Sequence, residues 1–314
     1  MSMENYKQET KDYMNRLQKE VEGVYLMANE ARKKGYDPVN KVEIPVALSM
    51  AEKVVGLIST VYPQMLNSGI TERILELEEQ YGKLDPTVIF TIAEEVADQK
   101  FCKFENIVQA MDAGIRVGFC YITLGVVSSP IEGYTGLEIG KTREGKEYII
   151  ANFSGPIRSA GTTASCIACF LIDFLREKFG FAKYDPTEDE IKRVWTELSD
   201  FHERITNLQY MPTEEEVIFI ATHMPFQVAG DPSEKMEVSN YKNLERVNTN
   251  QLRSGFCLIM AEGLAQKGPK AFRLYNMARE NGIQGKGFDW MEEYIEMVNK
   301  KGSSKGEKGE GKLT

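Results

Sequence analysis

The chain has 314 residues, of which 42% are hydrophobic and 27% are charged, and its formal net charge is −9. This length and hydrophobic content suffice to bury one large core or two smaller ones, and the composition is not that of a disordered chain. The negative charge argues against a protein that coats DNA uniformly, because neutralising phosphates requires clustered Lys and Arg. A local basic strip on an acidic protein is still compatible with this total.

The cysteines and the N-terminus indicate an intracellular protein. Five cysteines, an odd number, are typical of reduced thiols. The first residues are polar and lack the apolar core of a signal peptide. The longest apolar stretch, 162–175, is too short and too polar to span a bilayer. We therefore expect a cytoplasmic protein that does not contact membranes.

Hydrophobic periodicity predicts helices in the first part of the chain. Apolar residues recur at spacings of three and four over 3–34, and Gly35 ends this pattern. Further helical patterns cover 46–59, 70–81 and 86–100. The last of these opens with the cap-like pair Asp85-Pro86. We expect a mainly helical region over residues 1–118.

The second part of the chain mixes strand and helix signals. A β-branched and aromatic run covers 120–127. The segments GLEIGK and KEYIIANF then flank a Thr-Arg-Glu-Gly turn, and these two segments predict a β-hairpin. PFQVAGD and KMEVSN are short strand candidates. Helical patterns cover 159–179, 187–205, a segment that starts at Thr213, 251–281 and 288–300. Thr187 and Thr213 are each followed three residues later by Glu, which predicts capping boxes at these two helix starts. The expected fold class is α+β, with a helical N-terminal part followed by an α+β region over residues 119–300.

The last segment, 301–314, is a low-complexity run of Gly, Ser, Lys and Glu. Such a segment has too little apolar surface to order itself, so we expect a flexible, linker-like tail.

The most distinctive motif is the sequence FSGPIRSAG, where a predicted strand meets a predicted helix. Glycines permit tight backbone turns, and the free N–H groups of a helix start attract anions. The candidate phosphate-binding residues are Ser154, Gly155, Arg158, Ser159, Gly161 and Thr162. The structural alternative is that Gly155 and Pro156 form a turn, Ser159 caps the helix and Arg158 pairs with a carboxylate. The loop matches neither a Walker A motif nor GxGxxG.

Other chemistry finds little support in the sequence. Cys166 and Cys169 share a helix face, but a zinc site needs about four ligands, so a buried pair of small side chains is the better interpretation. The two histidines, His202 and His223, have no nucleophile at a telling spacing. Acidic residues occur mostly as helical runs, without a compact Asp-x-Asp cluster on a strand or turn. We do not expect catalysis by this chain alone.

Basic residues that could contact nucleic acid form two groups. The first group contains Lys141, Arg143 and Lys146 at the hairpin turn, together with Arg158. The second group contains Arg253, Lys267, Lys270 and Arg273. A hairpin tip is often charged simply because it is exposed, so the first group also has a structural interpretation.

Several segments resemble the large subunit of archaeal family D DNA polymerases. They include VEIPVALSMAEKV, EEVADQKFCKFEN, MDAGIRVGFCYITLGVVSSPIEGYT, FSGPIRSAG, KYDPTEDEIKRV, HERITNLQYMPTEEEV and GDPSEKMEVSNYKNLERVNTNQLRSGFCLIMAEGLAQK. The resemblance covers nearly the whole folded part in the same order, to about residue 270. It departs at Thr162, where the family usually has a second glycine.

The resemblance implies a role in DNA replication. The family's large subunit is several times longer, and its catalytic acids lie in a double-psi barrel far beyond this point, so none is carried over to this chain. The family implies a heterodimer with a small subunit that carries a 3′–5′ exonuclease, and Mg²⁺-dependent phosphoryl transfer on primer–template DNA in the archaeal nucleoid. It also implies a KH-like character for the α+β region.

Three hypotheses follow from the sequence. The first is a non-catalytic N-terminal module that scaffolds the polymerase and holds DNA, with the GPIRSAG loop, Lys141 and Arg143 as contacts. The second is a structural module that docks the rest of the large subunit without binding DNA. The third is an independent phosphate-binding enzyme.

Overall fold

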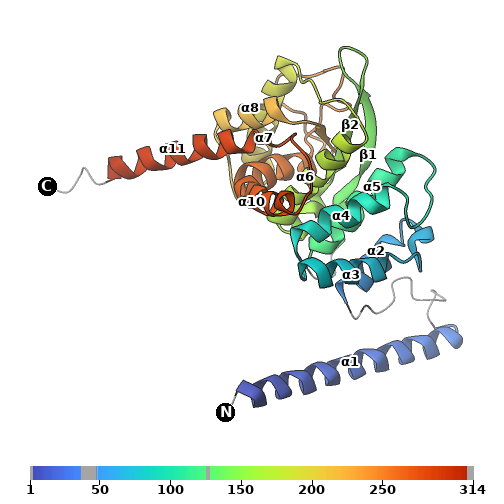
Figure 1. The fold of residues 1–314 in the computed structure, drawn as a ribbon. Coiled ribbons are helices and arrows are strands. Elements are labelled where there is room, and N and C mark those ends of the chain that lie inside the picture. Colours follow the sequence, from blue (N-terminus) through green and yellow to red (C-terminus); the bar gives the residue numbers. More distant parts are fainter. Residues whose placement is uncertain (1–2, 37–46, 48, 125–127, 310–314) are drawn as a thin grey trace. The chain divides into compact units, whose positions relative to one another are not determined.

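The computed structural model describes residues 3–36, 47, 49–124 and 128–309. Contacts divide the chain into two compact units, Met1–Val46 and Ala47–Thr314. The first unit contains α1 (Met3–Lys33), which confirms the helix predicted over 3–34 (Figure 1). Gly35 follows it with a φ of +73°, a conformation that glycine adopts without strain. Within the described part of this unit α1 exposes a row of large apolar side chains: Tyr13, Met14, Leu17, Val21, Val24, Leu26 and Met27.

The second unit begins with a layer of helices. These are α2 (Met50–Ile58), the short 3-10 helix η1 (Pro63–Met65), α3 (Ile70–Tyr81), α4 (Pro86–Ala97) and α5 (Ile107–Ile122). The side chain of Asp85 caps α4 by accepting a hydrogen bond from the N–H of Thr87 at 2.7 Å, as the sequence predicts.

Helix α5 is not predicted by the sequence patterns. Its last residues fall in the β-branched and aromatic run at 120–127. Residues 125–127 of that run lie outside the described residues. Every residue from Ala110 to Tyr121 is buried, including the charged side chains of Asp112 and Arg116. Glycines let α4 lie close to it, because a Cβ at Gly114 would overlap the carbonyl oxygen of Ala93.

A small mixed sheet follows the helical layer. The π-helix η2 (Ser129–Gly133) leads into β1 (Tyr134–Lys141), which pairs antiparallel with β2 (Glu147–Phe153) and confirms the predicted hairpin. β3 (Gln227–Ala229) pairs parallel with β2 on its other side, so the order is β1-β2-β3. The second strand candidate, KMEVSN, forms only an isolated bridge between Glu237 and Gln251.

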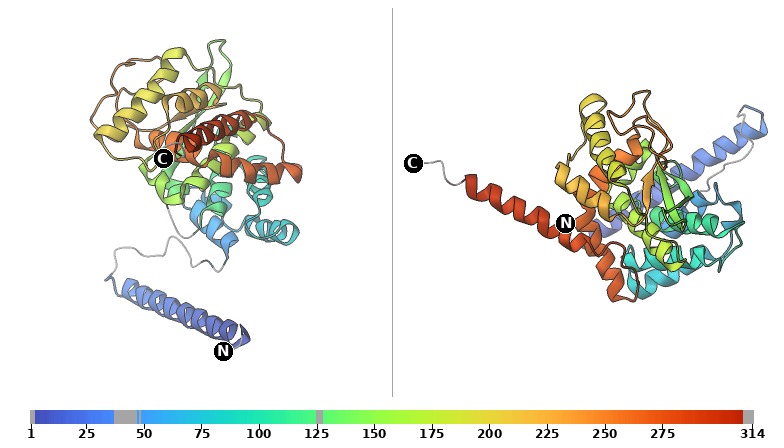
Figure 2. Two further views of the ribbon diagram at one scale, coloured as in Figure 1. Left: turned by 90° about the vertical axis from the view of Figure 1, so that its left-hand side faces the viewer. Right: turned by 90° about the horizontal axis from the view of Figure 1, so that it is seen from above.

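The remaining helices pack around the sheet and the first layer. They are the 3-10 helix η3 (Gly155–Ala160), α6 (Thr162–Lys178), α7 (Glu188–Arg204), α8 (Glu214–His223), α9 (Ser254–Leu258), the π-helix η4 (Ile259–Ala265), α10 (Gln266–Glu280) and α11 (Met291–Gly309). Capping boxes at Thr187 and Thr213 open α7 and α8, as predicted. Helices α4, α5, α6 and α10 pack on one another around a core that is aromatic at Phe170 and Tyr275 (Figures 1 and 2).

The fold is therefore α+β, as the sequence predicts. One difference concerns the end of the chain, because α11 continues to Gly309 where the composition predicts a flexible tail from residue 301. No helix in the described part of the chain is long and apolar enough to cross a membrane. A relation to KH domains stays a prediction.

Candidate phosphate-binding loop and basic surface

The GPIRSAG loop connects β2 to α6 through the 3-10 helix η3. Gly161 is the N-cap of α6 and has a φ of +83°, and Thr162 is the first helical residue. The glycine that the family usually has in place of Thr162 is therefore not required for this turn, because the positive φ falls on Gly161.

Arg158 forms an ion pair with a buried carboxylate. Its Nη2 lies 2.5 Å from Oε1 of Glu262 and its Nε lies 3.2 Å from Oε2, so the contact is bidentate. The side chain of Glu262 is 1% exposed, whereas that of Arg158 is 36% exposed. Oε1 of Glu262 also accepts the N–H of Gln209 at 2.8 Å. The structural interpretation of Arg158, a pairing with a carboxylate, is thus what the structure shows.

The two serines of the loop are bonded within the fold. The Ser154 hydroxyl donates to the carbonyl of Glu132. The Ser159 hydroxyl lies 2.6 Å from that of Ser129 and 2.9 Å from the carbonyl of Pro156. Ser159 does not cap α6, because it lies within η3 and Gly161 takes the N-cap position.

Glycines of three other segments pack against this loop. A Cβ at Gly230 or Gly255 would overlap the carbonyl of Phe153, and one at Gly133 would lie 2.6 Å from the N atom of Ile157. The loop is therefore a packing junction in which backbones meet at close range. A Cβ at Gly155, within the loop, would lie 3.2 Å from the hydroxyl oxygen of Ser254.

What the loop leaves available to a ligand is the start of α6. The N–H groups of Thr162, Thr163 and Ala164 have no acceptor among the residues that the structure describes. Such groups, together with the helix dipole, favour a bound anion. The proposed phosphate contact would rest on these groups and on the exposed part of Arg158.

The hairpin candidates lie at the other end of the same strand. β2 has seven residues, which separates the Lys141–Arg143 turn from the GPIRSAG loop by roughly 20 Å. The two groups of candidate residues therefore do not form one site. Lys141 is exposed at the end of β1.

Arg143 is held by Asp185. Its Nε and its backbone N–H lie 2.9 and 3.0 Å from Oδ2 of Asp185, and Nη1 of Arg246 lies 2.5 Å from Oδ1. Partial burial would raise the pKa of Asp185, but the hydrogen bonds from the two arginines outweigh it and lower this pKa to about 2. Arg143 is thus partly neutralised, although its side chain is 66% exposed.

Arg253 is not a surface cation, which corrects its assignment to the second basic group. Its side chain is 4% exposed and pairs with Glu197, with Nη2 2.6 Å from Oε2. A second arginine, Arg193 on α7, lies 3.5 Å from the same carboxylate. Its guanidinium donates hydrogen bonds to the carbonyls of Tyr241 and Thr249. This buried network fixes the long segment between β3 and α9 to α7. One signal for it is visible in the sequence, the spacing of four between Arg193 and Glu197.

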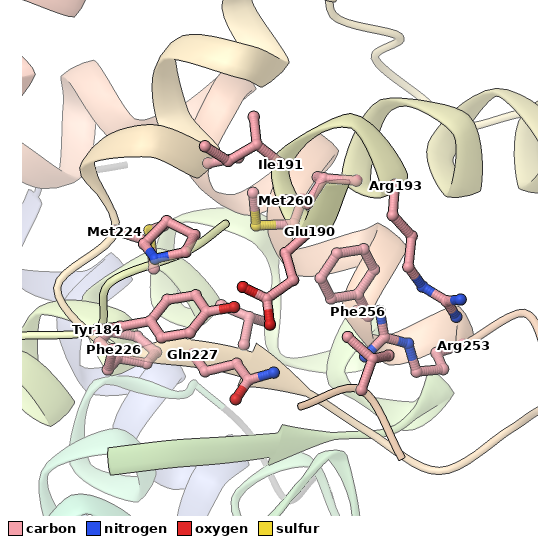
Figure 3. Close-up of a pocket in the computed structure, with 15 residues that line it drawn as sticks. Tyr184, Glu190, Ile191, Arg193, Met224, Phe226, Gln227, Arg253, Phe256 and Met260 are labelled. Atoms are coloured by element: carbon pink, nitrogen blue, oxygen red, sulfur yellow. The ribbon is translucent and has the colours of Figure 1, made fainter. Parts of the chain in front are cut away.

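A cavity of about 40 Å³ lies next to this network. Figure 3 shows the Glu190 carboxylate between Tyr184 and Gln227, with Arg193 and Arg253 to one side. The cavity is large enough for a few water molecules at most, so we do not interpret it as a substrate site.

Without the buried Arg253, the second basic group contains three residues, all on α10. Lys270 and Arg273 are exposed and Lys267 is half-buried. In the part of the chain that the structure describes, none of these three forms an ion pair, so their charge is available to a polyanion.

The thiols and carboxylates do not converge on a metal-binding arrangement. Cys166 and Cys169 are buried on α6, as expected for a pair of small core side chains, and burial raises the pKa of both thiols. Among the described residues, no three His, Cys, Asp or Glu side chains lie close enough to hold a metal ion.

Comparison with known proteins settles the family. Residues 12–297 match the family described as DNA polymerase II large subunit DP2, N-terminal. The chain belongs to this family. It is 41% identical over 286 residues to the DNA polymerase II large subunit of Nanoarchaeum equitans, which covers 91% of this chain and 23% of that protein. The corresponding protein of Archaeoglobus fulgidus is 38% identical over 296 residues, covering 94% of this chain and 24% of the relative.

The large subunit of Thermococcus kodakarensis matches over 314 residues at 34% identity, covering 99% of this chain but 17% of the relative. The chain thus spans about a quarter or less of the length of these DNA polymerase II large subunits. It corresponds to their N-terminal portion, as the resemblance predicted.

Proposed function

We propose that this chain is the N-terminal scaffold of the large subunit of a replicative archaeal DNA polymerase, and that it helps to hold primer–template DNA. The observation that carries the proposal is the family match over 12–297, which covers nearly all of the second compact unit. Template-directed synthesis, Mg²⁺ binding and the catalytic acids belong, on this proposal, to the remainder of the large subunit. The chain itself is not catalytic, and a small subunit supplies the 3′–5′ exonuclease.

The DNA-holding part of the proposal is supported by two features. Lys267, Lys270 and Arg273 follow one another at spacings of three along α10, which brings unpaired positive charge onto neighbouring turns of one helix. The open N–H groups at the start of α6 provide a separate place for a phosphate. Both features suit contacts to the DNA backbone rather than to bases.

A second candidate function is a structural docking module without DNA binding of its own. Its support is that several candidate cations are already paired: Arg143 with Asp185, Arg158 with Glu262 and Arg253 with Glu197. The net charge of −9 points in the same direction.

Fluorescence anisotropy with labelled primer–template DNA at several salt concentrations distinguishes the two. We expect salt-dependent binding by the wild-type chain. The double variant Lys270→Ala/Arg273→Ala removes charge without breaking an internal ion pair, so it tests DNA contact without damage to the fold. On duplex DNA, the slope of log K against log salt should fall by about 0.9 for each phosphate that is no longer neutralised, or roughly 2 for the two residues.

The matched control is Lys192→Ala/Lys242→Ala, which removes two exposed cations that are paired with Glu188 and Glu237. We expect this control to retain the wild-type slope. An equal decrease in slope for both double variants would reduce the effect to net charge and remove α10 as a DNA contact. No binding at the lowest salt would leave the docking module as the function.

A further inference from the structure

Among the described residues the sheet has two outer strands, β1 with eight residues and β3 with three, so β1 is the longer edge. The order β1-β2-β3 puts β1 outermost, next to α5 (Figure 1). A groove of about 680 Å³ opens along this edge. Residues 135–139 of β1 line it on one side, and Asn106, Gln109 and Asp112 line it on the other, at the start and along the first turns of α5. A groove between a sheet edge and a helix is a geometry that accepts an extended peptide as an added strand.

The hydrogen-bond pattern of the hairpin shows which backbone groups face this groove. The N–H of Thr142 donates to the carbonyl of Lys146 at 2.8 Å, so these two residues form a hydrogen-bonded pair. The carbonyl of Glu147 accepts from Ala182 at 2.9 Å and therefore points away from β1. Lys141 and Glu147 are accordingly a non-hydrogen-bonded pair, because the two kinds of pair alternate along an antiparallel ladder.

The same alternation extends along β1. Ile139 pairs with Ile149 and Leu137 pairs with Ala151, and both are non-hydrogen-bonded pairs. The N–H and C=O groups of Leu137 and Ile139 therefore point away from β2, toward the groove. No described residue donates to or accepts from these groups.

Exposed sheet edges in proteins are usually protected by bulges, charges or coverage. Among the described residues, β1 has a bulge and a lysine at its ends and one acidic side chain, Glu138, in its middle. A bulge lies between Tyr134 and Gly136, where Nη1 of Arg116 donates to the Tyr134 carbonyl at 3.0 Å, and Lys141 lies at the other end. Next to Glu138 the middle of the strand carries Ile139, whose apolar side chain is 37% exposed.

The charges in the groove indicate the kind of strand that fits. Asp112 accepts from Nε of Arg116 at 2.7 Å and from the hydroxyl of Tyr62 at 2.5 Å, so the Asp112–Arg116 pair is neutral. Glu138 remains as the uncompensated charge, with its carboxylate 2.9 Å from the side-chain amide of Asn152. A strand added here would pair best with a Lys or Arg opposite Glu138.

We propose that the free edge of β1 binds an extended segment from the remainder of the polymerase large subunit, which adds to the sheet as a fourth strand. The segment carries a basic residue opposite Glu138 and apolar residues beside Leu137 and Ile139. Length supports this source, because the matched relatives contain three quarters or more of their sequence outside the region that this chain spans. The inference rests on the proposed function only in that the chain works as part of a large subunit, and it does not require DNA binding.

Amide hydrogen exchange on the whole chain tests the edge directly. In the free chain, the amides of Leu137 and Ile139 should exchange fast, whereas those of Glu138 and Gly140, bonded to β2, should exchange slowly. Short overlapping peptides that tile the rest of the Nanoarchaeum equitans large subunit serve as probes. A peptide with alternating apolar residues and a central Lys or Arg should protect Leu137 and Ile139.

The variant Ile139→Pro removes one N–H of the free edge without removing a bond to β2, because that N–H points away from β2. It should weaken binding of the protecting peptide about fivefold or more, since one backbone hydrogen bond to the peptide is no longer made. The control Ile139→Val keeps the N–H and most of the apolar surface and should bind as the wild type does. Thermal unfolding of each variant establishes that the fold is intact.

Four results would overturn the proposal: slow exchange of both amides in the free chain, no protecting peptide in the tiled set, equal binding by Ile139→Pro and Ile139→Val, or protection that rises with protein concentration alone. The last result would mean that a second copy of the chain covers the edge. None of these outcomes depends on the anisotropy titration, so failure of DNA binding and failure of the edge interaction are separable.

Discussion

The two ends of β2 differ in what surrounds them. At its C-terminal end, the GPIRSAG loop is enclosed by Gly133, Gly230 and Gly255 and is anchored by Arg158 to the buried carboxylate of Glu262. At its N-terminal end, the hairpin turn projects into solvent and is held by ion pairs at the surface. One seven-residue strand thus joins a close-packed junction to an exposed tip.

The comparison shows why a polar, glycine-rich motif is ambiguous. Glycines that suit a phosphate loop also allow backbones to meet at close range, and an arginine that suits a phosphate also suits a carboxylate. In this loop the glycines allow close backbone packing, and the arginine pairs with a carboxylate. The backbone N–H groups at the start of α6 are what the junction leaves for an anion.

The largest effect should come from filling the junction. Gly255→Ala would push a Cβ into the carbonyl of Phe153 and the N atom of Ser154, which are backbone atoms that cannot rotate away. We expect the free energy of unfolding to fall by about 3 kcal/mol, as for severe overpacking. Urea unfolding followed by circular dichroism measures it.

The control for this variant is Gly263→Ala, in η4. A Cβ there would meet its closest atom, the hydroxyl oxygen of Ser165, at 3.5 Å, an ordinary contact. We expect its stability to stay within about 0.5 kcal/mol of the wild type. If both variants were equally stable, the close packing around Phe153 would not be what holds the loop.

Removal of the loop's arginine should have an intermediate effect. Arg158→Ala leaves Glu262 buried with only the N–H of Gln209 as a partner. Breaking a fully buried pair costs about 3–5 kcal/mol, and the partial exposure of Arg158 reduces our expectation to about 2 kcal/mol. The same denaturation measurement applies.

The double variant Arg158→Met/Glu262→Leu tests the cause of that destabilisation. Since it removes the carboxylate together with its partner, most of the stability should return. A double variant as unstable as Arg158→Ala would mean that the arginine acts through packing and not through its charge. Because of this structural cost, Arg158 is a poor reporter of DNA contact by itself.

Local signals in the sequence predict local structure well. The capping boxes at Thr187 and Thr213 and the hairpin turn are short-range patterns, and each appears where the sequence predicts it. Helix α5 escapes prediction because its C-terminal end, to Ile122, falls in the β-branched and aromatic run at 120–127, a composition that favours strands.

Pairings between distant residues cannot be predicted in the same way. Arg158 and Glu262 are 104 positions apart, and Arg253 and Glu197 are 56 apart, so only the folded chain reveals that these arginines have partners. Sequence alone groups Arg253 with the surface cations of α10, because charge does not report burial. The family, in contrast, is recognisable from sequence, since it depends on whole segments and not on single contacts.

The smallest effect should come from the exposed tip, and it should depend on pH. Arg143→Ala removes one of the two arginines that hydrogen-bond to Asp185, while Arg246 and the backbone N–H at position 143 still donate. Because the pair is largely exposed, we expect the variant to be less stable by about 0.5 kcal/mol at neutral pH. The pKa of Asp185 should rise from about 2 toward its ordinary value of 3.8, without reaching it.

The pH dependence separates charge from packing at this tip. A carboxyl group with a lowered pKa stabilises the fold above the pKa of the unfolded chain, and that contribution disappears as the pH falls through the folded value. The stability difference between Arg143→Ala and wild type should therefore shrink between about pH 4 and pH 2. The control Lys146→Ala removes only an exposed ion pair with Glu144 and should leave the titration of Asp185 unchanged in carboxyl NMR. A difference that stays constant across this range would show that Arg143 stabilises the turn by packing, and the hairpin tip would then resemble the junction at the other end of β2 more than its exposure suggests.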